Sequence, residues 1–294
     1  MRRREALLAL GSMAAMGPAI LHSAEQPAAD SAKPPFVLVV MDPLSDKLAC
    51  DCVKGYAQRK YDRLGELLEA TLERPVKVVY GDTLASVLRE KSGGRADLII
   101  GKCSVVKYDA AFNKLSVSLL AMLTGVDGTT TQSGLIIVPA RDPARTVKDL
   151  QGYTVFFGPA ECDEKNAAPI AFLKSQGITV PDKIEIRPNC TKAAAAIIDA
   201  EQPTKLAAVI SSYAQPLLEG CGTIEKGAIR VVGQTPAIPF IGAFAAAKLK
   251  GEDLETVRET LFAIGENPEM LKALESKQGF LPVTTQPDLV KKKN

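Results

Sequence analysis

Short apolar runs alternate with amphipathic stretches along most of this 294-residue chain, and this alternation limits its possible folds more than any other feature. The run at residues 36–41 (FVLVVM) stops at Asp42-Pro43, as expected for a buried strand that ends in a turn. Between residues 55 and 73, apolar side chains recur at spacings of three or four, which predicts an amphipathic helix. Strands joined through helices need crossover connections, so the chain is predicted to be an α/β protein with mostly parallel sheets.

Two strand-and-helix series follow one another, separated by polar passages at residues 124–134 and 232–240. Strands are predicted at residues 36–41, 76–80, 97–100 and 116–123, and then at 135–138, 153–157, 184–187, 207–210 and 229–232. Helices are predicted at residues 55–73, 83–90, 107–112, 164–175, 192–199 and 213–219, with a last one starting at Asn267-Pro268. Because the final helices are expected to return to the first series, this plan predicts two hinged lobes around a ligand cleft. The expected lobes are residues 36–127 plus 238–294 and residues 128–237.

The first 24 residues have the layout of an export signal. Arginines at positions 2–4 precede an apolar run from Ala6 to Leu21, and small residues around Ala24 offer a cleavage site. Arg3-Arg4 also fits a twin-arginine signal, so both export routes stay open, and residues 25–35 are expected to form a disordered tail. The mature protein is therefore expected in the periplasm as a monomer of nearly zero net charge. It has no basic excess for nucleic acid and no apolar run long enough for membrane insertion.

The only histidine of the chain, His22, lies inside the predicted signal. A mature chain without histidine cannot use Ser-His or Cys-His catalysis or an imidazole metal site. We therefore expect a protein that is not an enzyme and that needs no cofactor.

The cysteines leave three hypotheses open: disulfides, a thiolate metal or metalloid site, and a redox role. The chain has six of them, at positions 50, 52, 103, 162, 190 and 221, and an even number in an oxidising compartment favours disulfides. Cys50, Cys52, Cys103 and Cys162 follow predicted strands at the expected cleft, so they could instead form a thiolate site for a soft metal or a metalloid. The sequence identifies neither the pairing nor the metal.

Five short stretches are together similar to elements of one known family. They are GTTTQSGLIIV at 128–138, DP at 142–143 with TVKDLQG at 146–152, FGP at 157–159, AAVISSY at 207–213, and the prolines at 236 and 239. On these residues the chain resembles the phosphate/phosphonate-type substrate-binding components of ABC transporters, which have the type II periplasmic binding fold. The resemblance implies capture of a small polar ligand, such as an oxyanion, for an ABC permease or a membrane sensor.

The resemblance and the strand ends together give the candidate ligand-binding residues. The hydroxyl-rich crossing supplies Thr129, Thr130, Thr131, Gln132 and Ser133. Strand ends supply Asp42, Lys102, Ser104, Ser212 and Tyr213, because ligands bind at the carboxyl ends of strands in open α/β sheets. The alternatives are a solvated loop, a surface lysine and capping hydroxyls.

One segment departs from the family pattern. Where the family opens a helix with Ser, Thr and Gly, this chain has Glu161-Cys162-Asp163-Glu164. Carboxylates favour a helix N-terminus, but they repel an anion, which argues against phosphate or phosphonate as the ligand. A hard-cation site is the alternative, although the spacing is not that of a calcium loop. Two functions follow: a periplasmic solute-binding protein, or a thiol-based metal or metalloid carrier or sensor on the same fold.

Overall fold

The computed structural model of the protein describes residues 33–49, 58–201 and 205–283. The chain divides into residues 1–33 and residues 34–294, and all secondary structure described below belongs to the second unit. The predicted export signal, most of the predicted tail, Cys50 and Cys52 lie outside the described residues, so the predictions about them stay open. Within the described ranges, no helix is long and apolar enough to cross a membrane.

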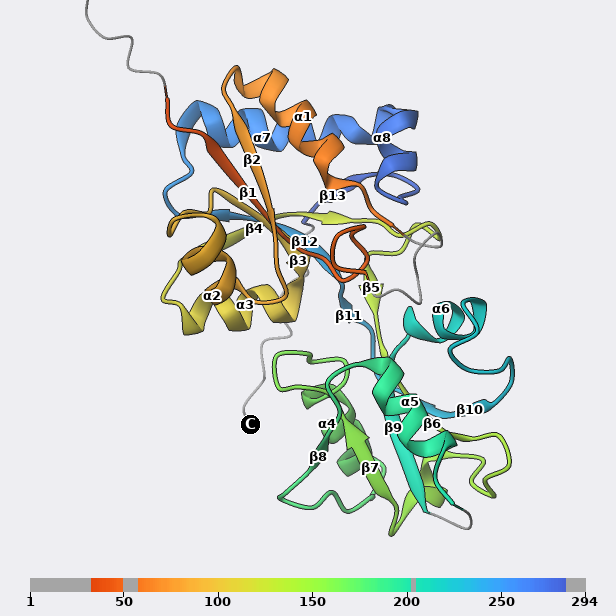
Figure 1. The fold of residues 1–294 in the computed structure, drawn as a ribbon. Coiled ribbons are helices and arrows are strands. Elements are labelled where there is room, and N and C mark those ends of the chain that lie inside the picture. The colour runs from red at the N-terminus through yellow and green to blue at the C-terminus, as the bar shows by residue number, and fades with distance from the viewer. Residues whose placement is uncertain (1–32, 50–57, 202–204, 284–294) are drawn as a thin grey trace, which may run out of the picture. The chain divides into compact units, whose positions relative to one another are not determined.

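The first sheet has six strands in the order β13-β4-β12-β3-β1-β2 (Figure 1). The strands are β1 (Phe36–Met41), β2 (Val76–Tyr80), β3 (Leu98–Lys102), β4 (Val117–Leu123), β12 (Ile241–Ala246) and β13 (Phe280–Pro282). β1 is parallel to β2 and β3, whereas β12 is antiparallel to β3 and β4, and β13 is antiparallel to β4. The C-terminal strands β12 and β13 therefore complete the sheet begun by β1 to β4.

Helices cover both faces of the first sheet because the side chains of β1 alternate between two cores. Phe36, Leu38 and Val40 pack on one face, under α1 (Tyr61–Leu72), α7 (Gly251–Ala263) and α8 (Pro268–Ala273) (Figure 1). Val37 and Val39 pack on the other face, under α2 (Leu84–Ser86), the π-helical turn Val87–Lys91 and α3 (Cys103–Phe112). A 3-10 turn, Ile264–Glu266, joins α7 to α8.

The second sheet has five strands in the order β10-β6-β9-β7-β8. They are β6 (Gly134–Pro139), β7 (Thr154–Phe157), β8 (Glu185–Ile186), β9 (Leu206–Ser211) and β10 (Ile229–Gln234). Alternation along β9 again feeds two cores, Ala208 and Ile210 on one side and Ala207 and Val209 on the other. The first core packs under α5 (Cys190–Ile198) and α6 (Ala214–Gly220), and the second under α4 (Ala167–Ser175) and the 3-10 turn Val147–Leu150.

Two crossings run side by side between the sheets. β5 (Thr131–Gln132) and β11 (Ile238–Pro239) pair antiparallel, and the Phe240 amide donates to the Thr130 carbonyl at 2.9 Å. Each crossing leads directly into a strand, β5 into β6 and β11 into β12. The polar passages predicted from the sequence contain this pair.

The α/β class is confirmed, but the prediction of mostly parallel sheets is wrong. The parallel pairings are β1-β2 and β1-β3 in the first sheet and β7-β8 and β7-β9 in the second, and the other pairings are antiparallel. β6 and β12 enter their sheets from a crossing rather than through a helix, and both are antiparallel to both of their neighbours. Helix–strand alternation does not reveal such an entry, and β12 itself was not predicted.

Helix starts differ from prediction where tertiary contacts hold the chain. The helix predicted from residue 55 is observed from Tyr61; residues 55–57 lie outside the described ranges, and Arg59 forms a bridge with Ser45 instead of a helical turn. The helix predicted from Glu164 begins at Ala167, because a closed turn precedes it, with the Gly158 amide bonded to the Lys165 carbonyl. The predicted Asn267 cap is confirmed, since its side chain accepts a hydrogen bond from the Met270 amide.

Candidate functional site

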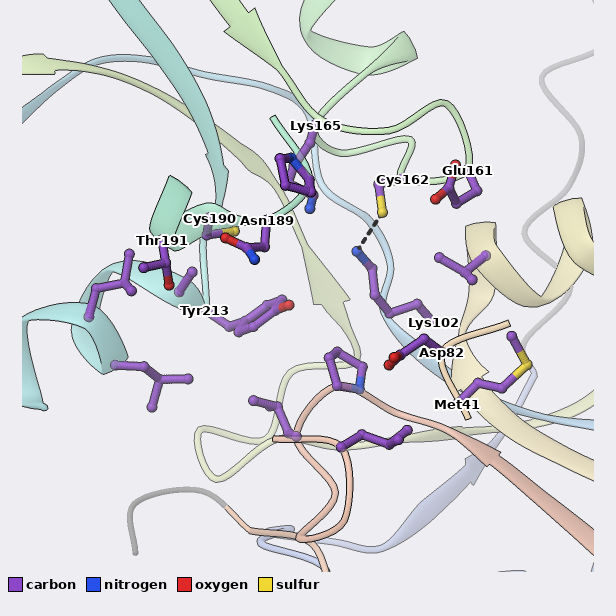
Figure 2. Close-up of a pocket in the computed structure, with 18 residues that line it drawn as sticks. Met41, Asp82, Lys102, Glu161, Cys162, Lys165, Asn189, Cys190, Thr191 and Tyr213 are labelled. Atoms are coloured by element: carbon purple, nitrogen blue, oxygen red, sulfur yellow. Dashed lines mark hydrogen bonds between the residues drawn. The ribbon is translucent and has the colours of Figure 1, made fainter. Parts of the chain in front are cut away.

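A cavity of about 480 Å³ lies where loops from both sheets meet (Figure 2). On the first sheet it is lined by residues at or just after the ends of β1, β2 and β3, which include Met41, Asp82 and Lys102. On the second sheet it is lined by residues after β7, β8 and β9, which include Cys162 and Tyr213. All six are carboxyl ends of strands, the edge where open α/β sheets bind ligands.

Lys102 and Glu164 form a buried ion pair beside this cavity. Lys102 is the last residue of β3, Glu164 belongs to the turn before α4, and Lys102 Nζ lies 2.5 Å from Glu164 Oε1. The Ser211 hydroxyl, at the end of β9, donates to the same oxygen at 2.7 Å. The two charged side chains are only 6% and 0% exposed, so they depend on each other for neutralisation.

The surroundings keep both members of the pair charged. Burial alone would lower the pKa of Lys102, but the electrostatic effects of the neighbouring Tyr213, Glu164 and Cys162 side chains outweigh it, and the pKa is raised. Burial alone would raise the pKa of Glu164, but the charge and hydrogen bond of Lys102 outweigh it, and the pKa is lowered. An ammonium and a carboxylate therefore face each other at neutral pH.

Two glycines allow the Glu164 turn to lie against the second sheet. A Cβ on Gly134 of β6 would stand 1.9 Å from the carbonyl oxygen of Glu164, and one on Gly158 would stand 2.5 Å from Cβ of Lys165. The Asn166 side chain closes the turn by donating to the Gly158 carbonyl at 2.7 Å. The backbone approach thus fixes Oε1 of Glu164, while Oε2 is buried without a hydrogen-bond partner among the described residues.

Two thiols, Cys162 and Cys190, also line the cavity. Cys162 Sγ lies 3.5 Å from Lys102 Nζ (Figure 2), and burial raises the pKa of this thiol although Lys102 partly opposes the change. Cys190 Sγ accepts from the Ser211 amide at 3.4 Å. The four cysteines that the structure describes are free, so it gives no support to a disulfide among them. Nor do the described residues include a cluster of three or more His, Cys, Asp or Glu suited to a metal ion.

An aromatic and aliphatic wall forms the rest of the cavity. The ring of Tyr213 stacks on Phe240 with centroids 4.9 Å apart and an interplanar angle of 20°. In Figure 2 the Tyr213 hydroxyl points toward the side of the cavity that holds Lys102. The aliphatic side chains come from both sheets and include Leu44, Leu48 and Leu217. The cavity therefore combines a large apolar surface with a few charged groups.

Three of the sequence candidates line the cavity: Lys102, Cys162 and Tyr213. Asp42 instead forms a buried ion pair with Arg59 at 2.8 Å. Ser104, at the start of α3, accepts from the Asp163 amide at 3.4 Å. Their roles in ligand binding stay predictions.

The remaining candidates lie mainly at the crossings. The Ser133 amide donates to Ser212 Oγ at 3.1 Å, and the Ser212 amide donates to the Ser133 carbonyl at 2.8 Å. Thr129 bonds to the side chain of Asp127, and Thr130 and Thr131 belong to the paired crossings. Gln132 is buried, and neither atom of its side-chain amide has a hydrogen-bond partner in the described part of the chain. Cys103 is part of the core behind β3, where burial raises its pKa to about 12.

Sequence reasoning missed several lining residues and misplaced one segment. Asp82, Lys165 and Asn189 line the cavity, and Asp82 and Asn189 come soon after strands, a signal that could have found them. The acidic segment at residues 161–164 does not open α4, whose first turn holds no acidic residue. Its Glu164 is instead neutralised by Lys102, because the turn folds back against β6.

Two mixed α/β sheets joined by paired crossings, with a cavity at the strand ends of both, define a small-molecule binding protein of the type II periplasmic fold. The family model described as the periplasmic substrate-binding protein of an ABC phosphonate transporter matches residues 55–287, which is most of the chain. The protein therefore belongs to this family of exported, solute-binding transport components. A comparison with curated protein sequences found no match.

Solved structures agree on the fold. A Xanthomonas citri protein bound to chloride is 16% identical with a TM-score of 0.63, and covers 85% of this chain and 92% of its own. A binding component of a Pseudomonas aeruginosa ABC phosphonate transporter is 14% identical with a TM-score of 0.63, covering 85% and 82%. Prochlorococcus marinus PhnD1, in complex with methylphosphonate, is 11% identical with a TM-score of 0.61, covering 85% and 93%. At these identities the similarity establishes the fold and not the ligand.

Proposed function

We propose that the protein binds one small molecule in the cavity beside Lys102 and Tyr213 and passes it to an ABC permease or a membrane sensor. The observation that carries this proposal is the cavity itself, which has about 480 Å³ and is lined from both sheets. Small-molecule sites of roughly 300–1,000 Å³ with few polar groups on apolar walls are typical of such binding. Lys102 and Tyr213 are the proposed ligand contacts.

Release of the ligand requires the site to open. We place the hinge at the paired crossings, β5 and β11, and propose that residues 36–127 plus 238–294 and residues 128–237 move as two lobes. Thr129 to Ser133 and Ser212 lie at these crossings, where they would hold the hinge and border the ligand. The Lys102–Glu164 pair would join the lobes in the closed state.

The proposal involves no covalent chemistry. The chain has no histidine after position 22, and burial keeps the cavity thiol of Cys162 protonated, so it is a poor nucleophile. We propose that the protein acts in the periplasm as a monomer after cleavage near Ala24.

The test is ligand binding by two tyrosine variants. Native mass spectrometry of the full chain, exported and purified without denaturation, identifies any co-purified molecule, and calorimetry measures its affinity. Tyr213→Ala should weaken binding at least about tenfold, because it removes a cavity wall that stacks on Phe240. Tyr108→Ala is the matched control, since Tyr108 is 50% exposed on α3 and does not line the cavity. Equal affinities for both variants would contradict the proposed site.

One observation favours the thiol-based alternative: Cys162 and Cys190 face the same cavity. Soft metals and metalloids bind thiolates, however, and the raised pKa of Cys162 works against ionisation. Metal analysis of protein purified under reducing conditions separates the two functions. A bound soft metal that is lost in Cys162→Ser and Cys190→Ser would favour the carrier or sensor.

A further inference from the structure

The two donors beside the cavity already hold an anion of the chain itself. Lys102 Nζ and Ser211 Oγ converge on Oε1 of Glu164 at 2.5 and 2.7 Å. An ammonium and a hydroxyl directed at one point are the donor set that a carboxylate, phosphate or phosphonate oxygen requires. Because Glu164 is fully buried, this donor set is closed to a free anion while the pair is formed.

The charges that remain around the cavity do not favour an anion. With Lys102 neutralised by Glu164, the charged lining among the residues that the structure describes consists of Lys165, Asp82 and Glu161. One positive charge thus stands against two negative ones, and a dianion would add to the negative side. Within residues 33–49, 58–201 and 205–283, the aliphatic and aromatic walls supply no further positive charge.

We propose that Glu164 is a built-in carboxylate that fills the anion subsite formed by Lys102 and Ser211, and that the cavity consequently takes an uncharged or cationic organic molecule with an apolar portion. This inference rests on the proposed function, because it assigns the ligand class of the same cavity. Glu164 acts as a specificity-determining residue: it excludes free oxyanions by supplying the anion itself.

The proposal predicts that removing the carboxylate opens the subsite. In Glu164→Ala, Lys102 is left buried without its partner, and a small anion that enters the vacated space restores the pairing. Acetate, inorganic phosphate and methylphosphonate are the probes, and thermal unfolding midpoints and calorimetry of the full chain are the readouts. We expect the variant to bind at least one of the three at least about tenfold more tightly than the wild type, which should show no binding at millimolar concentration.

Controls separate a specific subsite from general salt effects. Lys102→Met combined with Glu164→Ala has the same space without the ammonium and should lose the anion response, and chloride at equal ionic strength should not reproduce it. If Glu164→Ala does not fold, Glu164→Ser also vacates the position of the carboxylate while keeping a small polar group in the turn, and it should still raise anion affinity above wild type.

The result distinguishes this inference from the proposed function. Tight binding of phosphate or methylphosphonate by the wild type would overturn the inference and leave a solute-binding protein intact. A folded Glu164→Ala or Glu164→Ser variant with no gain in anion affinity would overturn it as well. Failure of the proposed function would show separately, as an unchanged ligand affinity in Tyr213→Ala, because Tyr213 is not one of the donors to Glu164.

Discussion

Two buried ion pairs stand at strand ends of this molecule, and they are built differently. Asp42, just after β1, uses both carboxylate oxygens: Oδ2 accepts from Arg59 at 2.8 Å and Tyr61 at 2.6 Å, and Oδ1 accepts from the Leu44 amide at 2.9 Å. Glu164 uses only Oε1, and its Oε2 has no partner among the described residues. The first pair is fully satisfied, whereas the second keeps unused hydrogen-bonding capacity beside a cavity.

The pairs also differ in what they connect. Asp42, Arg59 and Tyr61 all belong to the first-sheet side, and Arg59 Nε donates to the Leu274 carbonyl near the end of α8 at 3.1 Å. Lys102 and Glu164 join a strand of the first sheet to a loop of the second. The first arrangement suits permanent structure, whereas the second would break under the proposed separation of the lobes.

The largest effect is expected from breaking the first pair. Asp42→Ala leaves the guanidinium of Arg59 buried without a counter-ion, and arginine cannot escape by deprotonating. We expect a loss of about 3–5 kcal/mol in the free energy of unfolding, measured by denaturant titration. Asp182→Ala, an exposed site, is the control and should stay within about 0.5 kcal/mol. A similar small change in both variants would show that the Asp42 network is not structural.

A smaller effect is expected from Lys102→Met. Without Lys102, the Glu164 carboxylate can take up a proton and become neutral, whereas Arg59 in the Asp42 variant stays charged. We therefore expect a smaller loss, about 2–3 kcal/mol in the free energy of unfolding. Ligand affinity should also change in this variant, because Lys102 lines the cavity, whereas the exposed-site control Asp182→Ala should leave it within about twofold. The measurement is calorimetry under native conditions, alongside denaturant unfolding.

A double variant sharpens the same contrast. Lys102→Met with Glu164→Leu replaces both charges by apolar groups and should recover most of the stability lost in Lys102→Met. If the double variant is as unstable as the single variants added together, the pair contributes through packing rather than charge.

Particular strands and site residues show how much of this structure could be predicted from the sequence. β1 was predicted at its observed bounds, because FVLVVM is a continuous apolar run closed by Asp-Pro. β12 was missed because IGAFAA is rich in Gly and Ala, which carry little strand signal. Lys102 and Tyr213 were identified because they follow predicted strands. The pairing of Glu164 was not predicted, because its partner Lys102 lies 62 residues away in the other sheet. The acidic residues were instead interpreted as the start of α4.

The smallest effect expected is a pH dependence that belongs to the cavity pair. Lys102 lowers the pKa of Glu164 against the opposing effect of burial, so the unfolded state binds the proton more readily than the folded state. The stabilisation from this group is therefore complete above its unfolded pKa, about 4.3, and is lost as the pH falls through the lower folded value. Comparison of wild type with Glu164→Gln by denaturant unfolding should give a constant difference from pH 6 to pH 8 that shrinks in more acidic solution. A stability difference that persists unchanged in the most acidic solution would mean that Glu164 is not ionised in the folded protein. The Asp42 and Glu164 pairs would then differ in their hydrogen bonding alone.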